Sequence, residues 1–64
     1  MRLPYPVLLI LHCNDGGIQH AVAVVDDLIF DSTQTVALKL CEQSFHFICN
    51  RNGGLQKIDA IYMF

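Results

Sequence analysis

Runs of apolar residues alternate with short polar breaks along most of this chain. The runs are rich in β-branched and aromatic residues, which favour strands, and the breaks hold Asn, Asp and Gly, which favour turns. Apolar positions in the segment 41–50 instead recur at helical spacing, which places Cys41, Phe45, Ile48 and Cys49 on one face. The pattern therefore predicts an α+β fold in the order β-β-β-α-β: a mainly antiparallel sheet of about four strands with one helix on a face. The predicted strands lie near residues 5–13, 18–25, 28–31 and 55–64, and the helix near 41–50.

Two polar breaks predict the hairpins that connect the first three strands. The run from Asn14 to Gly17 is the clearest turn signal, since Asn, Asp and Gly tolerate the positive φ of tight hairpins. Its expected register places Leu11 opposite His20. The pair Asp26-Asp27 marks the second turn. The alternating residues at 36, 38 and 40 fit either an extended segment or the start of the helix, and the last strand is expected to return beside the first.

His20 and Asp31 are the candidate catalytic pair. If the second turn is centred on its two aspartates, Val22 faces Asp31, and the period of two along a strand puts His20 on the same side. The two residues are then diagonal neighbours, within reach of a hydrogen bond between imidazole and carboxylate. An Asp bonded to one ring nitrogen fixes the His tautomer and supports the imidazolium, so we assign His20 as a general base and Asp31 as its orienting acid.

A structural role explains the same two residues. A half-buried histidine often satisfies a backbone carbonyl, and the run Asp31-Ser32-Thr33 suits an Asp that caps the polar connection after the third strand. The sequence leaves both interpretations open.

The stretch from about residue 5 to 33 resembles the C-terminal half of a papain-like-fold cysteine peptidase. Its transglutaminase-like and bacteriocin-processing branches also place a His and an Asp on adjacent strands, as His20 and Asp31 are placed here. Three segments are also similar to uncharacterised mobile-element-associated proteins: Pro-Val-Leu-Leu, His-Ala-Val-Ala-Val-Val and Ile-Phe-Asp-Ser. The resemblance implies a hydrolase or acyltransferase that acts on a peptide or isopeptide bond, with the base at His20 and the orienting role at Asp31.

The nucleophilic thiol is the part of this resemblance that the chain does not supply. The family's catalytic Cys normally opens a helix well before the His, whereas the residues before His20 predict a strand. Cys13 is the nearby thiol that would complete a triad, although it has no helix N-terminus to lower its pKa, and a small buried apolar residue is its other interpretation. We therefore expect the thiol to come from a missing N-terminal half or a partner chain.

Length and composition predict one small domain over residues 1–64, which would be the C-terminal half of a larger papain-like domain if the resemblance holds. A chain of 64 residues is near the size at which one core is only marginally stable alone. With 53% hydrophobic and only 16% charged residues, we expect an apolar patch that needs covering. The alternative function is accordingly a non-catalytic interaction module or a homodimer.

Charge, the length of apolar runs and cysteine spacing argue against several other kinds of partner and site. The formal net charge is −2 and the four basic residues are not clustered, so no nucleic-acid partner is predicted. The apolar run 7–11 is too short to cross a bilayer, so no membrane contact is predicted either. An odd number of cysteines without close pairs indicates a reducing, cytoplasmic setting. The same wide spacing argues against a zinc site built from Cys13, His20, Cys41, His46 and Cys49, so neither a metal nor a cofactor is expected.

Overall fold

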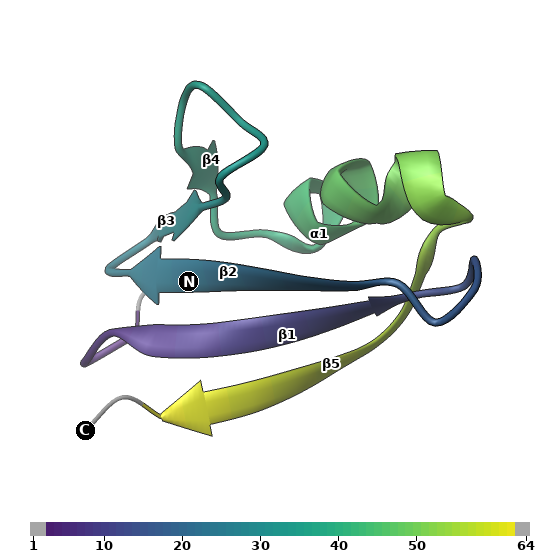
Figure 1. Ribbon diagram of the computed structural model, residues 1–64. Coiled ribbons are helices and arrows are strands. Elements are labelled where there is room, and N and C mark those ends of the chain that lie inside the picture. The colour runs from purple at the N-terminus through teal and green to yellow at the C-terminus, as the bar shows by residue number, and fades with distance from the viewer. Residues whose placement is uncertain (1–2, 63–64) are drawn as a thin grey trace.

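Two hairpins and a returning C-terminal strand build the sheet of this protein (Figure 1). The computed structural model describes residues 3–62, and over this range a five-stranded antiparallel sheet carries one α-helix, which confirms the predicted α+β class. The elements in chain order are β1 (Val7–Cys13), β2 (Gln19–Val25), β3 (Leu28–Phe30), β4 (Leu38–Lys39), α1 (Glu42–Cys49), a 3₁₀ turn (Asn50–Asn52) and β5 (Leu55–Tyr62).

The strand order across the sheet is β4-β3-β2-β1-β5, so the first strand lies between the second and the last. Val25 pairs with Leu28 across the second turn, and Leu11 pairs with His20 across the first, as the turn signals predicted. The C-terminal strand returns antiparallel beside β1, as expected. Residues 63 and 64 of the predicted last strand lie outside the described part of the chain.

The short strand β4 is an addition to the predicted order. Within the alternating segment 36–40, Leu38 and Lys39 form this strand instead of starting the helix, and Lys39 pairs with Leu28 of β3. The backbone N–H of Leu40 then donates to the carbonyl of Asp27 at 2.7 Å. Two residues are too few for a period-two pattern to be recognised, which is why the sequence left this segment open between strand and helix.

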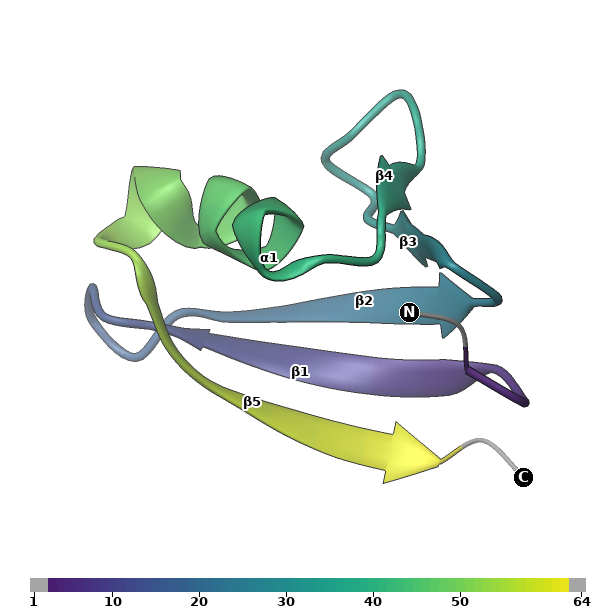
Figure 2. The ribbon, with the colours of Figure 1, turned by 180° about the vertical axis from the view of Figure 1, so that it is seen from behind.

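The core lies between α1 and one face of the sheet (Figure 2). Alternate residues of β1 face the helix, and the helix contributes the apolar side that the 3.6-residue spacing predicted, with Phe45 partly buried against it. Ten buried residues make up this core: Val7, Leu9, Leu11, Cys13, Val22, Val24, Ile29, Leu40, Ile48 and Cys49.

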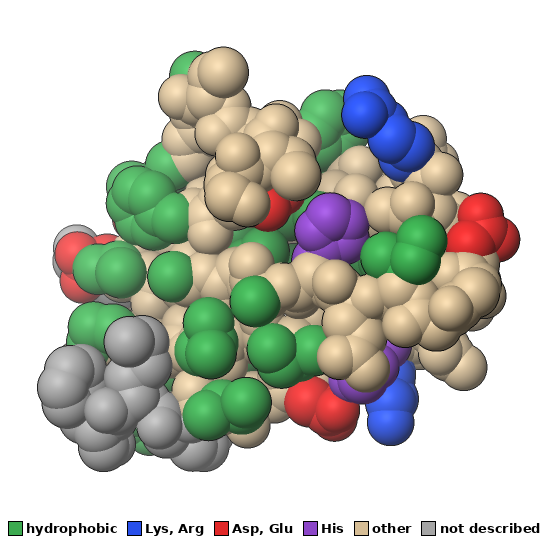
Figure 3. Space-filling model, in the orientation of Figure 1, with side chains coloured by type: hydrophobic (Ala, Val, Ile, Leu, Met, Phe, Trp, Pro, Cys, Tyr) green, Lys and Arg blue, Asp and Glu red, His purple; other side chains and the backbone are tan. Residues whose placement is uncertain are grey.

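The opposite face of the sheet, here called the open face, is also apolar. In the described part of the chain no helix or strand covers it, and hydrophobic side chains gather over the long strands on the side seen in Figure 3. Phe30 and Ile61 of this face are 48% and 51% exposed. The strand registers assign eight apolar residues to the open face: Leu8, Ile10, Ala21, Ala23, Val25, Leu28, Phe30 and Ile61.

The exit from α1 depends on a glycine. The helix tightens into the 3₁₀ turn and stops at Gly53, whose φ of 81° lies in the left-handed region that favours glycine. The N–H of Gly54 then donates to the carbonyl of Cys49 at 3.0 Å, so a carbonyl at the helix end is satisfied. This reversal sends the chain directly into β5.

We expect Gly53→Ala to destabilise the protein more than Gly17→Ala. Both glycines have a positive φ, 81° and 73°, so alanine costs about 1–2 kcal/mol of backbone strain at either position. A Cβ on Gly53 would also lie 2.5 Å from the carboxylate oxygen of Asp15 and 3.2 Å from its backbone nitrogen, whereas a Cβ on Gly17 meets nothing within 4 Å. Urea unfolding of the two variants measures the difference, and equal losses would contradict this account.

Candidate functional site

His20 is the best-placed candidate for chemistry. It lies near the start of β2, opposite Leu11, and its side chain is therefore on the helix-facing side of the sheet. The residue is half-buried, and the amide nitrogen of Asn52 lies 3.2 Å from its Nε2. This contact joins two residues that are 32 positions apart in the chain. A side-chain amide thus orients the ring, a role that the sequence assigned to Asp31.

The turn between β1 and β2 brings Asn52 to this histidine. The N–H of Asp15 donates to the carbonyl of Asn52, and the N–H of Asn14 donates to the carbonyl of Gly54, both at 3.0 Å. The side-chain amide of Asn14 adds a third bond, to the carbonyl of Gly53 at 3.0 Å. Since this contact is made mostly by backbone groups at two distant turns, no residue pattern in the sequence predicts it.

The ring of His20 lines a pocket of about 310 Å³ with a mixed polar and apolar lining. The pocket is bounded by the end of α1, the 3₁₀ turn and the connection after β3. Its lining offers amide, hydroxyl and guanidinium groups, which hold peptide-like substrates by hydrogen bonds. The remaining lining residues are Thr33, Gln34, Phe47, Ile48, Asn50, Arg51 and Asn52.

Asp31 lies one residue beyond β3 and is the buried acid of the described chain, with 6% of its surface exposed. The hairpin register ends with the pair Ala23 and Phe30, and continuing the alternation by one residue places Asp31 on the side of the sheet that His20 occupies. Its carboxylate, however, accepts hydrogen bonds from the hydroxyl of Thr33 at 2.5 Å and from the Thr33 N–H at 3.4 Å. Among the described residues no hydrogen bond joins His20 to Asp31, so the orienting role of Asp31 stays a prediction.

Cys13, the predicted candidate nucleophile, contacts another thiol. It is buried at the end of β1, and its Sγ lies 2.9 Å from the Sγ of Cys49 at the end of α1. Burial raises the pKa of the Cys49 thiol to about 12, and the adjacent Cys13 thiol and the carboxylate of Asp31 add to the shift. The Cys49 thiol is therefore held in its protonated form, and the Cys13 sulfur beside it is enclosed in the core, away from any substrate.

Cys41 is a further thiol, which the sequence analysis placed on the apolar helix face and weighed as a zinc ligand but not as a nucleophile. It is the N-cap of α1 and is half-buried. The side chain and the backbone of Ser44 lower the pKa of its thiol by hydrogen bonding. The Ser44 hydroxyl also donates to the carbonyl of Lys39 at 2.6 Å, so its one proton serves either that carbonyl or the sulfur. A cysteine that begins a helix is the recognisable sequence signal here.

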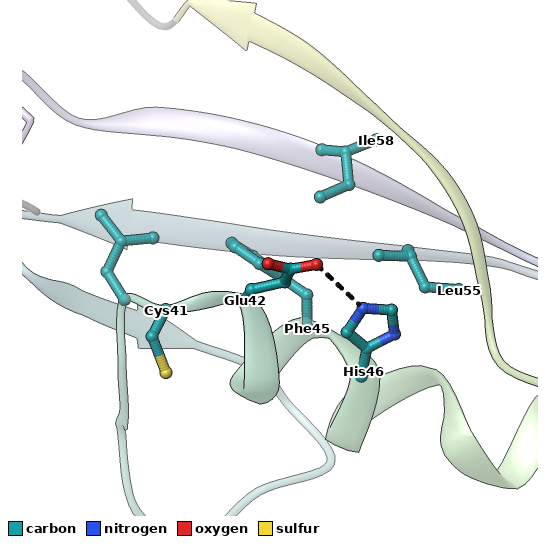
Figure 4. Close-up of a pocket in the computed structure, with 7 residues that line it drawn as sticks. Cys41, Glu42, Phe45, His46, Leu55 and Ile58 are labelled. Carbon is teal, nitrogen blue, oxygen red and sulfur yellow. Dashed lines mark ion pairs between the residues drawn. The ribbon is translucent and has the colours of Figure 1, made fainter.

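The surroundings of Cys41 are apolar and do not provide a base for it. The residue lines an open groove of about 370 Å³ with Phe45, Leu55 and Ile58. His46 lies in the same groove and forms an ion pair with Glu42 when protonated, at 3.5 Å. Figure 4 shows the Cys41 sulfur pointing away from the His46 ring. Cys41 and His46 therefore line the same groove, but the imidazole of His46 does not face the Cys41 thiol.

A bonded histidine and carboxylate do occur on the open face. Nε2 of His12 lies 2.7 Å from Oδ2 of Asp59, across the ladder between β1 and β5. Asp59 pairs with Ile10 in the register, so the two residues are diagonal neighbours of the kind expected for the His20 pair. Asp59 is more than half exposed, which makes this a solvent-facing contact.

Metal and membrane sites are not apparent in residues 3–62. Over this range no three His, Cys, Asp or Glu side chains gather closely enough to hold a metal ion. No described helix has the length and apolar character needed to cross a membrane.

The chain has no significant match among protein-family models, curated proteins or solved structures.

We expect the Asn52 amide to hold the His20 ring in a single tautomer, because it bonds to one of the two ring nitrogens. Asn52→Ala removes that bond and should allow both tautomers to exchange. Nitrogen-15 NMR of the ring distinguishes the two forms. The ring of His46, which contacts Glu42 instead, is the internal control and should be unchanged. Identical His20 ring signals in the wild-type protein and the variant would contradict the assigned contact.

Proposed function

We propose that this chain is the histidine-bearing half of a papain-like cysteine peptidase or acyltransferase. His20 is the general base, and the substrate is a peptide or isopeptide bond. The observation that supports this proposal is the half-buried imidazole of His20, held by a side-chain amide at the wall of an open pocket with a mixed lining. A base held in one orientation beside a substrate-sized pocket is the arrangement that nucleophilic catalysis needs.

Asn52 supplies the third group of the proposed constellation. An amide takes the orienting position in the Cys-His-Asn variants of the catalytic triad. The nitrogen and oxygen of an amide have nearly the same shape, and a half-turn of the Asn52 side chain places its oxygen against an Nε2–H of His20. Nδ1 of the ring is then free to accept a proton from a thiol. Asp31 is proposed to support the same end of the pocket through Thr33, which lines it.

The thiol is proposed to come from another segment or another chain. Cys13 and Cys49 contact each other in the core, and Cys41 lies in the separate apolar groove. In the proposed reaction His20 takes the proton of the incoming thiol, and the thiolate attacks the substrate carbonyl. The protonated ring then gives its proton to the leaving amine, and water or a second amine releases the acyl group.

Labelling by an electrophile tests this function. The natural protein at its full length is treated with a peptide vinyl sulfone, which alkylates activated cysteines, and the modified residue is mapped by mass spectrometry. We expect His20→Ala to slow labelling by at least about 100-fold, since a general base contributes roughly that much. His46→Ala, a matched change of an exposed histidine, should leave the rate unchanged.

Three results would overturn the assignment. These are no labelling of the wild-type protein, equal labelling of the His20→Ala variant, and labelling confined to Cys13, Cys41 or Cys49. Proton–nitrogen correlation spectra of both variants show whether they remain folded, so that a loss of structure is not mistaken for a loss of the base.

A homodimer is the second candidate, favoured by the open face. This face presents eight apolar residues without a covering layer in the described chain, and exposed apolar patches of this kind mark interaction surfaces. Sheets pack face to face through interdigitating apolar side chains, and a second copy brings an identical face. In this proposal two copies stack their open faces on each other, and the fold has no catalytic role.

Phe30→Lys is expected to convert such a dimer to a monomer, because it places a charge on the open face, which the dimer would bury. Phe47→Lys is the matched control, since Phe47 is 60% exposed on the helix, away from the open face. Size-exclusion chromatography with light scattering gives the mass of each variant. A monomeric wild-type protein, or the same mass for both variants, would exclude a dimer through the open face.

A further inference from the structure

The two buried thiols form a pair that the proposed reaction does not use. Cys13 ends β1 and Cys49 ends α1, and only 1% and 0% of their surfaces are exposed. Their sulfur atoms lie 2.9 Å apart, although the residues stand 36 positions apart in the chain. A disulfide bond is about 2.05 Å long, so less than about 1 Å of movement would join the two sulfurs.

The position of this pair connects the two halves of the core. The end of β1 belongs to the first hairpin, and the end of α1 leads through the 3₁₀ turn to Asn52, the partner of His20. A covalent bond between the two cysteines would fasten the helix to the sheet at this end. Small domains whose cores are marginal gain most from such cross-links.

We infer that Cys13 and Cys49 are a redox modification site, at which a small-molecule disulfide such as oxidised glutathione converts the dithiol to an intramolecular disulfide. One cysteine, as thiolate, attacks a sulfur of oxidised glutathione and releases one molecule of glutathione. The second cysteine, after losing its proton, attacks the resulting mixed disulfide and releases another. The two cysteines are oxidised, two glutathione molecules are formed, and the two protons end on their thiols.

The surroundings of the pair set the rate of this exchange. Both sulfurs are enclosed, and burial keeps Cys49 protonated, so the exchange requires transient opening of the helix end. Cys41 is more accessible and reacts without opening. A mixed disulfide with glutathione is therefore expected first at Cys41, followed more slowly by the bond between Cys13 and Cys49.

The test uses reduced protein incubated with excess oxidised glutathione and then quenched in acid. Cys41→Ala is used beside the wild type, because it removes the competing thiol and keeps the pair. We expect a species lighter by two hydrogen atoms, with a proteolytic fragment that contains Cys13 bonded to Cys49. A loop of this length should raise the thermal midpoint by about 10–25 °C, reversibly on addition of dithiothreitol.

A second variant keeps the inference falsifiable. Cys49→Ala should show neither the loss of two hydrogens nor a higher midpoint after the same treatment. If that variant does not fold, the peptide map of the wild type decides the question alone. A bond that includes Cys41, a glutathione adduct without any intramolecular bond, or an unchanged midpoint in the oxidised protein would overturn the inference.

Discussion

The contact between the first hairpin turn and the end of the helix is the constraint on which the rest of the structure depends. Three hydrogen bonds from Asn14 and Asp15 reach the carbonyls of residues 52–54, and the paired thiols of Cys13 and Cys49 lie beside the same junction. Because these donors and acceptors are mostly backbone groups, the junction requires a particular path of the chain more than particular side chains. It fixes the exit of α1, the entry of β5 and the place of Asn52 at once.

The open face follows from having one helix for a sheet that is apolar on both sides. Leu8 and Ile10 alternate with the core residues of β1 and point away from α1. A strand with one solvated face normally carries polar residues at such positions. The helix can cover only the other side, so the apolar character of β1 is left facing outward. This excess of apolar surface is what a partner would bury.

His12 contacts Asp59 across the strands, whereas His20 has no hydrogen bond to Asp31 among the described residues. The difference comes from competition by nearby hydrogen-bond donors for the Asp31 carboxylate. Asp59 lies inside the ladder, where the strand holds its side chain toward His12. Asp31 lies beyond the last paired residue of β3, and its carboxylate is taken by donors of Thr33, two residues later. A turn of this kind offers Asp nearby partners that a cross-strand histidine must displace. Position on a shared face is therefore necessary for a pair but does not produce one.

Much of the architecture was accessible from the sequence because it rests on local physics. The spacing of apolar residues determined the long strands and the helix, and the turns at Asn14–Gly17 and Asp26-Asp27 set the registers that put Leu11 opposite His20 and Val25 opposite Leu28. The two-residue strand β4 was not recognisable, because it is shorter than the period that reveals a strand.

The contacts of the candidate site could not be predicted from the sequence, because they join residues that are close only in the folded chain. His20 could be placed on its face by alternation, but its partner Asn52 and the meeting of Cys13 with Cys49 join segments that are more than 30 positions apart. Periodicity assigns each residue a side of its own element and says nothing of which distant element arrives there. Tertiary structure decided those partners, because backbone hydrogen bonds between two turns set the distance between the helix end and the hairpin.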